Sequence, residues 1–96
     1  MDLAAAVQTA NWHLCQNNDA NMFMTAWVAT LDWETGLLTF VNAGHNPPLL
    51  RHKNSWEWLT KRGGIILGSY ERAPFRSATL TLEAGDELLL YTDGVN

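Results

Sequence analysis

The sequence predicts an α+β fold in which a single N-terminal helix is followed by about six mainly antiparallel strands. Two observations support this prediction. Apolar residues recur at helical spacing only near the N-terminus, and short apolar or alternating segments separated by Gly, Pro and Asn follow. The connections between these segments are short, as is typical of antiparallel sheets. Because one helix cannot cover two sheet faces, we expect the chain to be part of a larger domain.

Composition limits the class of protein. The 96 residues can form one small domain, and a hydrophobic fraction of 47% is enough for a core. Only 17% of the residues are charged, so disorder is not expected. The formal net charge of −4 argues against nucleic acid and against an anionic membrane surface as partners, and no apolar run could span a membrane. The single cysteine, Cys15, cannot form an internal disulfide, which suits a reducing compartment such as the cytoplasm.

The helix is predicted over residues 3–16. Ala4, Ala5 and Ala6 add helix propensity, and the polar segment 16–21 is typical of a turn. Apolar residues spaced by three and four form one stripe that is expected to face the core: Leu3, Val7, Ala10 and Leu14.

A strand-rich region is predicted over residues 22–93. Its first segment, 22–31, is apolar or neutral on both faces, which predicts a central strand covered on both sides. Residues 32–36 end in Gly and predict a hairpin, and residues 37–43 form the returning strand.

The later strands are predicted to be shorter. Pro47 and Pro48 cannot sit in a central ladder, so residues 44–48 must form a loop. Gly63 and Gly64 interrupt the pattern again. The remaining strands are predicted at 49–52, 56–60, 77–82 and 87–92.

Four blocks of this sequence resemble a known family: 18–26, 31–50, 67–68 and 83–95. Two motifs in these blocks are specific as a pair, although either alone is weak. They are Asn-Ala-Gly-His-Asn-Pro-Pro at 42–48 and Tyr-Thr-Asp-Gly-Val at 91–95. Together the blocks resemble the central part of the stage II sporulation E family. These proteins are bacterial signalling phosphatases of the metal-dependent, type 2C-like (PPM-type) serine/threonine class.

The resemblance implies a sandwich of two antiparallel sheets flanked by helices on both outer faces, an α-β-β-α arrangement. It also implies an active site at one end, where acids from several strands hold two Mg²⁺ or Mn²⁺ ions. A metal-bridging hydroxide would attack the phosphorus of a phosphoserine or phosphothreonine directly. Hard ions of this kind take carboxylate, carbonyl and water oxygens as ligands.

Few site residues carry over from the family. Asp93 matches the metal-binding Asp of the Tyr-Thr-Asp-Gly motif, and Gly94 matches the glycine that lets the chain turn beside the metals. The family's first metal box, an Asp followed by Gly-His-Gly, and its closing acidic pair do not occur in residues 1–96. We therefore expect a partial domain that does not retain the two ions and is inactive as an isolated piece.

Each residue also has a simpler interpretation. An Asp-Gly pair after a strand is by itself most often a turn. His45 and Asn46 belong to a possible loop at the active-site end. Together with Asn42 they are expected to shape this loop through bonds to the backbone, rather than to act as a general acid or phosphate contact. Trp56 and Trp58 are expected to pack in the core or at a sheet edge. Ordinary surface or turn positions are expected for His52, Asp32, Glu34, Asp86 and Glu87.

Two functions remain open. The first is a piece of a protein-serine/threonine phosphatase, a hydrolase whose substrate is a phosphorylated regulatory protein of the anti-sigma-factor antagonist type. The second is a non-catalytic binding or regulatory module that retains the phosphatase scaffold. In either case open sheet edges are expected to pair with another copy of the chain, giving a homo-oligomer.

Overall fold

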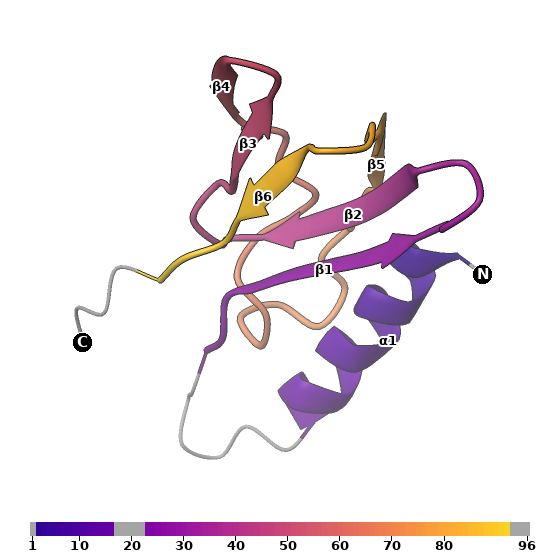
Figure 1. Ribbon diagram of the computed structural model, residues 1–96. Helices are drawn as coiled ribbons and strands as arrows, with labels where there is room; N and C mark the ends of the chain where they lie inside the picture. The colour runs from indigo at the N-terminus through magenta and orange to yellow at the C-terminus, as the bar shows by residue number, and fades with distance from the viewer. Residues whose placement is uncertain (1, 17–22, 93–96) are drawn as a thin grey trace.

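One helix and two three-stranded antiparallel sheets make up the computed structural model, which describes residues 2–16 and 23–92 (Figure 1). The elements are α1 (Leu3–Gln16), β1 (Ala26–Leu31), β2 (Leu37–Ala43), β3 (Leu49–His52), β4 (Ser55–Trp58), β5 (Ala78–Thr81) and β6 (Glu87–Leu89). The first sheet has the order β1-β2-β5, and the second has the order β4-β3-β6. This arrangement confirms the predicted α+β class.

Helix α1 covers one face of the first sheet, over the residues predicted from the sequence. Asp2 caps the helix, because its side chain accepts a backbone N–H of the first turn at 3.1 Å. Leu3 and Val7 are buried, as predicted. Ala10 and Leu14 are exposed, so the predicted stripe was wrong over the later turns.

Asn11 takes the buried position in the second half of the helix. Its side chain is fully buried; Oδ1 accepts the Gly68 N–H at 2.9 Å and Nδ2 donates to the Tyr70 carbonyl at 2.8 Å. A polar side chain can lie in the core here because both of its polar ends are bonded. Asn11 thereby ties α1 to the segment 68–70.

The first sheet is centred on β2, which pairs with β1 on one side and with β5 on the other. The predicted hairpin is confirmed, since Asp32 N–H donates to the Leu37 carbonyl at 2.9 Å and Gly36 has a φ of 78°. The prediction of a central strand covered on both sides for 22–31 was wrong, because β1 lies at a sheet edge and Val28, Thr30 and Leu31 are exposed. An apolar composition shows neither which neighbouring strands are present nor whether both faces are covered.

Strand β4, at the edge of the second sheet, is exposed. Every residue of β4 is exposed, including Trp56 and Trp58. Of the two positions expected for these tryptophans, core packing was wrong and the sheet edge is confirmed. The Arg51 guanidinium lies 6.0 Å from the Trp56 ring centre, and the Trp58 and Tyr91 rings lie 6.0 Å apart. The last strand, predicted over 87–92, ends at Leu89.

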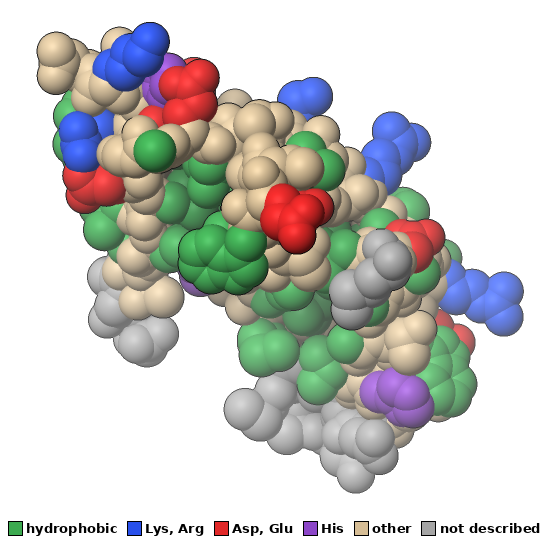
Figure 2. Space-filling view, turned by 45° about the vertical axis from the view of Figure 1, so that its right-hand side comes forward, with side chains coloured by type: hydrophobic (Ala, Val, Ile, Leu, Met, Phe, Trp, Pro, Cys, Tyr) green, Lys and Arg blue, Asp and Glu red, His purple; other side chains and the backbone are tan. Residues whose placement is uncertain are grey.

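The layers follow the order helix, first sheet, second sheet. Val41 and Ala43 of β2 pack in a buried cluster with Leu3 and Val7 of α1. Phe40, on the opposite face of β2, lines a groove of about 440 Å³ whose other walls come from β3, β4 and β5. Figure 2 shows hydrophobic side chains at the surface across the middle of the molecule. Within the described residues, helical cover is present on one outer face of the sandwich only.

Asp86 does not behave as the solvated turn acid that was expected. Its side chain is only 5% exposed. Oδ2 accepts the Glu83 backbone N–H at 2.9 Å, and Oδ1 lies 2.7 Å from Nδ1 of His52. These contacts join the turn 83–86 to the end of β3. The sequence could not reveal them, because His52 and Asp86 meet only through the pairing of β3 with β6.

The hydrogen bond from Glu83 lowers the pKa of Asp86 below its ordinary 3.8; burial opposes this, and the His52 bond and the charges of His52 and Arg51 add to it. The lowered pKa means that ionised Asp86 stabilises the fold at neutral pH and that this stability is lost as the pH falls through the folded-state value. We expect Asp86→Asn to be less stable at neutral pH, with a difference that shrinks below about pH 4.

Urea unfolding midpoints of both proteins, measured from neutral to acidic pH, check this expectation. The matched control is Glu57→Gln, which removes an exposed carboxylate of β4 and should leave the pH profile unchanged. A stability difference for Asp86→Asn that stays constant with pH would contradict the assignment.

Candidate functional site

The pairing of β3 with β6 directs the segment that leads to the second motif toward the end of the molecule that holds the loop 44–48. Strand β3 begins at Leu49, directly after the loop 44–48, and Leu49 pairs with Leu89 of β6. Because the pairing is antiparallel, β6 runs toward that loop. The described chain beyond β6 continues in the same direction in Figure 1. The ends of β2 and β6 lie on the same side of the molecule in Figure 1.

The two residues matched to the family's metal motif, Asp93 and Gly94, lie outside the described residues. Their assignment therefore stays a prediction. Tyr91 and Thr92 are the last described residues before them, and Tyr91 is half-buried with its ring against Trp58.

Asn42 shapes the loop, as predicted. The residue is only 2% exposed. Its side-chain Oδ1 accepts the His45 N–H at 2.8 Å, and Nδ2 donates to the His45 carbonyl at 3.1 Å. The chain turns at Gly44, which has a φ of 72° and whose missing Cβ would lie 3.0 Å from the Ile66 nitrogen. A side chain at residue 44 would be strained in that conformation and crowded by the neighbouring backbone.

His45 and Asn46 are half-buried on this loop. The His45 ring was expected to bond to the backbone, but its Nδ1 instead lies 3.0 Å from the hydroxyl of Thr25. It is the backbone of His45, held by Asn42, that fixes the loop. The ring bond ties the loop to the segment that precedes β1.

A segment that the sequence marked only as a break lies against the end of β2. The backbone N–H groups of Gly63 and Gly64 both donate to the Asn42 carbonyl, at 2.8 and 3.0 Å, and the Arg76 N–H donates to the Gly63 carbonyl at 2.7 Å. A Cβ on Gly63 would lie 2.3 Å from the Arg76 carbonyl oxygen, and one on Gly64 would lie 2.5 Å from the Phe75 ring. Only glycine allows three stretches of backbone to approach so closely.

Sequence reasoning missed the basic residues beside these glycines. Lys61, Arg62 and Arg76 line a pocket of about 450 Å³ together with Asn42. The available signal was the order Lys61-Arg62-Gly63-Gly64, in which two cations precede two glycines. Arg76 could not have been added to this group from the sequence, since its place depends on the hydrogen bond to Gly63.

The described residues do not by themselves fit a metal centre. Among residues 2–16 and 23–92, no group of three or more His, Cys, Asp or Glu side chains is placed to hold an ion. Two Mg²⁺ or Mn²⁺ ions require several carboxylate oxygens. No chemical step through a metal therefore follows from these residues. In the same part of the chain, the helix is neither long nor apolar enough to cross a membrane.

Comparison with known proteins gives a match over the whole chain. Residues 1–96 match the family model described as Stage II sporulation protein E. The chain is 30% identical over 91 residues to Protein IcfG of Synechocystis sp., covering 94% of this chain and 14% of that protein. It is 31% identical over 81 residues to Phosphoserine phosphatase RsbU of Bacillus subtilis, covering 83% of this chain and 24% of that protein.

A third relative is Phosphoserine phosphatase RsbP of Bacillus subtilis, with 34% identity over 83 residues, 85% of this chain and 21% of that protein. The chain thus spans between 14% and 24% of the length of these three relatives. No solved structure matches it significantly.

Proposed function

The chain belongs to the stage II sporulation E family, and from this membership we propose that residues 1–96 form part of a protein-serine/threonine phosphatase domain. Two of its relatives carry the name phosphoserine phosphatase, which supports hydrolysis of phosphoserine or phosphothreonine as the reaction. The substrate we propose is a phosphorylated regulatory protein of the anti-sigma-factor antagonist type, in the cytoplasm.

The observation that supports this proposal is the direction of β6. The register of β3 against β6 directs the end of β6 toward the loop 44–48, although the two motifs are far apart in the sequence. A carboxylate that follows this strand, in the direction of a loop fixed by buried hydrogen bonds, would be suitably placed as a metal ligand. We assign that role to Asp93, with Gly94 as the adjacent turn and with His45 and Asn46 on the facing loop.

The proposal includes two Mn²⁺ or Mg²⁺ ions in the complete domain, which supply an activated water for attack on the phosphate. Residues 1–96 contribute Asp93, and the other ligands come from residues outside this segment. We therefore propose that the isolated chain has no phosphatase activity. A non-catalytic binding module remains the alternative.

The test compares the isolated chain with a longer polypeptide that joins it to the residues encoded on both sides. We expect the longer polypeptide to hydrolyse a phosphoserine peptide with Mn²⁺, and we expect hydrolysis to stop when the metal is chelated. The isolated chain should give no turnover.

Light scattering on the same samples checks the proposed pairing of open sheet edges, with a dimer or larger species expected. A longer polypeptide that binds the phosphoprotein without hydrolysing it would favour the binding module.

A further inference from the structure

A basic pocket lies beside the end of β2, outside the loop and strand discussed above. Three cationic side chains line it, those of Lys61, Arg62 and Arg76. The chain has six Lys and Arg residues in all and a net charge of −4, so half of its cations gather around one pocket of an acidic molecule. The hydroxyl-bearing residues Ser77 and Thr79 also line the pocket and offer further donors.

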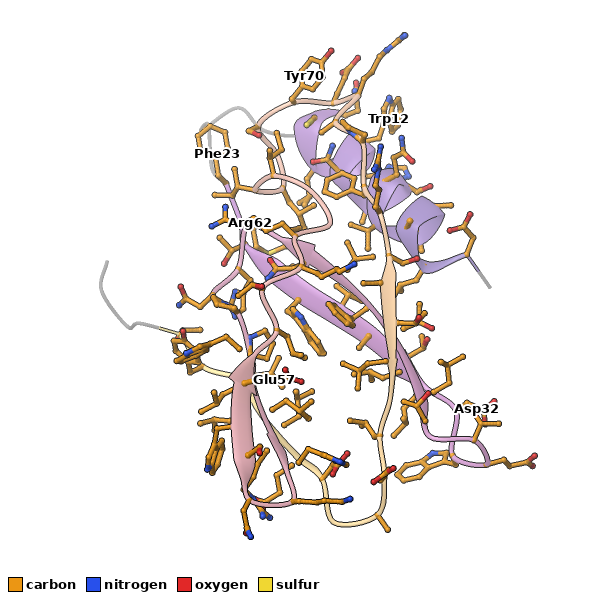
Figure 3. All side chains as sticks on the ribbon, turned by 90° about the horizontal axis from the view of Figure 1, so that it is seen from above. Trp12, Phe23, Asp32, Glu57, Arg62 and Tyr70 are labelled. Carbon is orange, nitrogen blue, oxygen red and sulfur yellow. The ribbon has the colours of Figure 1, made fainter. Side chains whose placement is uncertain are left out.

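The backbone holds the two arginines together. Gly63 donates its N–H to the Asn42 carbonyl at 2.8 Å and accepts the Arg76 N–H at 2.7 Å, so three segments run side by side. Arg62 precedes Gly63, and it is therefore a neighbour of Arg76 across hydrogen-bonded backbone. Figure 3 shows Arg62 on the segment between β4 and β5. The pocket is thus built on fixed backbone, which limits the entropy lost when a ligand binds.

The three cations have no carboxylate partner within residues 2–16 and 23–92. The ion pairs found there join Arg51 to Glu87 and His52 to Glu83 and Asp86. All three side chains of the pocket belong to exposed residues. Positive charge that is not matched inside an acidic molecule attracts an anionic group, and the planar guanidinium donates two parallel hydrogen bonds to a carboxylate or phosphate.

Asn42 connects this pocket with the proposed active-site end. Its carbonyl oxygen holds Gly63, and its side chain holds the backbone of His45 on the loop 44–48. The loop and the pocket are therefore both attached to one residue at the end of β2.

We propose that the pocket of Lys61, Arg62 and Arg76 binds acidic side chains that flank the phosphoserine of the substrate protein. This inference rests on the proposed function for the identity of the substrate, but its binding chemistry is independent of turnover. Carboxylates fit because two neighbouring arginines can each bind one, with the lysine as an additional point charge. Exposed contacts of this kind weaken as salt is added.

The experiment measures binding of two phosphoserine peptides to the 96-residue chain in the presence of a chelator. The peptides are identical except that the glutamates flanking the phosphoserine in one are glutamines in the other. We expect the acidic peptide to bind about tenfold more tightly, and Arg62→Gln or Arg76→Gln each to remove about three- to tenfold of its affinity. Arg62→Lys keeps the charge but loses the paired donors. Its affinity for the acidic peptide should lie between those of the original chain and Arg62→Gln.

The matched control is Arg72→Gln, an exposed arginine outside the pocket with the same change in charge, which should bind as the original chain does. Circular dichroism of each variant confirms that it is folded. Equal binding of the two peptides, or an equal loss for Arg72→Gln, would overturn the proposal. Charge-dependent binding by the chain together with a longer polypeptide that lacks phosphatase activity would retain the pocket and reject the proposed function. Phosphatase activity of the longer polypeptide, without charge-dependent binding by the chain, would retain the proposed function and reject the pocket.

Discussion

Replacing Asp93 by Asn in the longer polypeptide is expected to lower phosphoserine hydrolysis by at least about a hundredfold. Asparagine has nearly the same shape as aspartate, but it cannot supply the anionic oxygens that Mn²⁺ and Mg²⁺ prefer. Changes in residues that only support a metal ligand already cost about 10- to 100-fold in affinity or activity, so loss of a ligand should cost at least the upper end of that range. Initial rates at saturating substrate, measured over a series of Mn²⁺ concentrations, provide the test.

The Mn²⁺ series separates a ligand role from a structural one. A weakened metal site is partly restored by a higher concentration of Mn²⁺, and circular dichroism in the absence of metal shows whether the variant is folded. The matched control is Glu34→Gln, which removes one negative charge at the exposed tip of the β1–β2 hairpin and should leave the rate unchanged. An Asp93→Asn protein with the original rate at every Mn²⁺ concentration would rule out the metal-ligand assignment.

Local signals were sufficient for most of the secondary structure. The helix has the predicted bounds because its cap and its first two apolar turns are encoded within a few residues. The β1–β2 hairpin was predicted from the short segment 32–36, which ends in Gly. The turn is local, because Asp32 and Gly36 close it through their own backbone. The errors concern positions whose burial depends on distant partners. Asn11 is buried by bonds to residues 68 and 70, and Asp86 is covered at the end of β3.

The candidate site also combines features that local sequence predicts with features that depend on distant partners. The sequence identified the loop 44–48 and the end of the last strand as chemically important, but it could not show that they lie at one end of the molecule. That follows from the β3–β6 register, which joins residues far apart in the chain. The basic pocket was missed because Arg62 and Arg76 become neighbours only through Gly63, and Gly63 takes its place only by bonding to Asn42.

Asn42 is therefore the residue whose loss should do the most damage to the fold around the site. We expect Asn42→Ala to lower the free energy of unfolding by about 2–4 kcal/mol, because the N–H and carbonyl of His45 lose their partners and each unpaired group costs roughly 1–3 kcal/mol. The midpoint of urea unfolding should fall while the dependence on urea concentration stays the same, since the surface exposed on unfolding hardly changes.

Two further variants separate the hydrogen bonds of Asn42 from general effects of the loop. Asn46→Ala removes an amide of the same size from the same loop, one that makes no hydrogen bond within the described residues, and should change stability by less than about 0.5 kcal/mol. Asn42→Asp retains the acceptor for the His45 N–H but replaces the donor to the His45 carbonyl with a second acceptor, so its loss should approach that of Asn42→Ala. An Asn42→Ala protein as stable as the Asn46→Ala protein would show that the loop does not depend on this side chain. The side chain of Asn42 holds the loop 44–48, and its backbone carbonyl holds Gly63 beside the basic pocket. If Asn42→Ala were harmless, these hydrogen bonds would no longer explain how the loop and the pocket are held together.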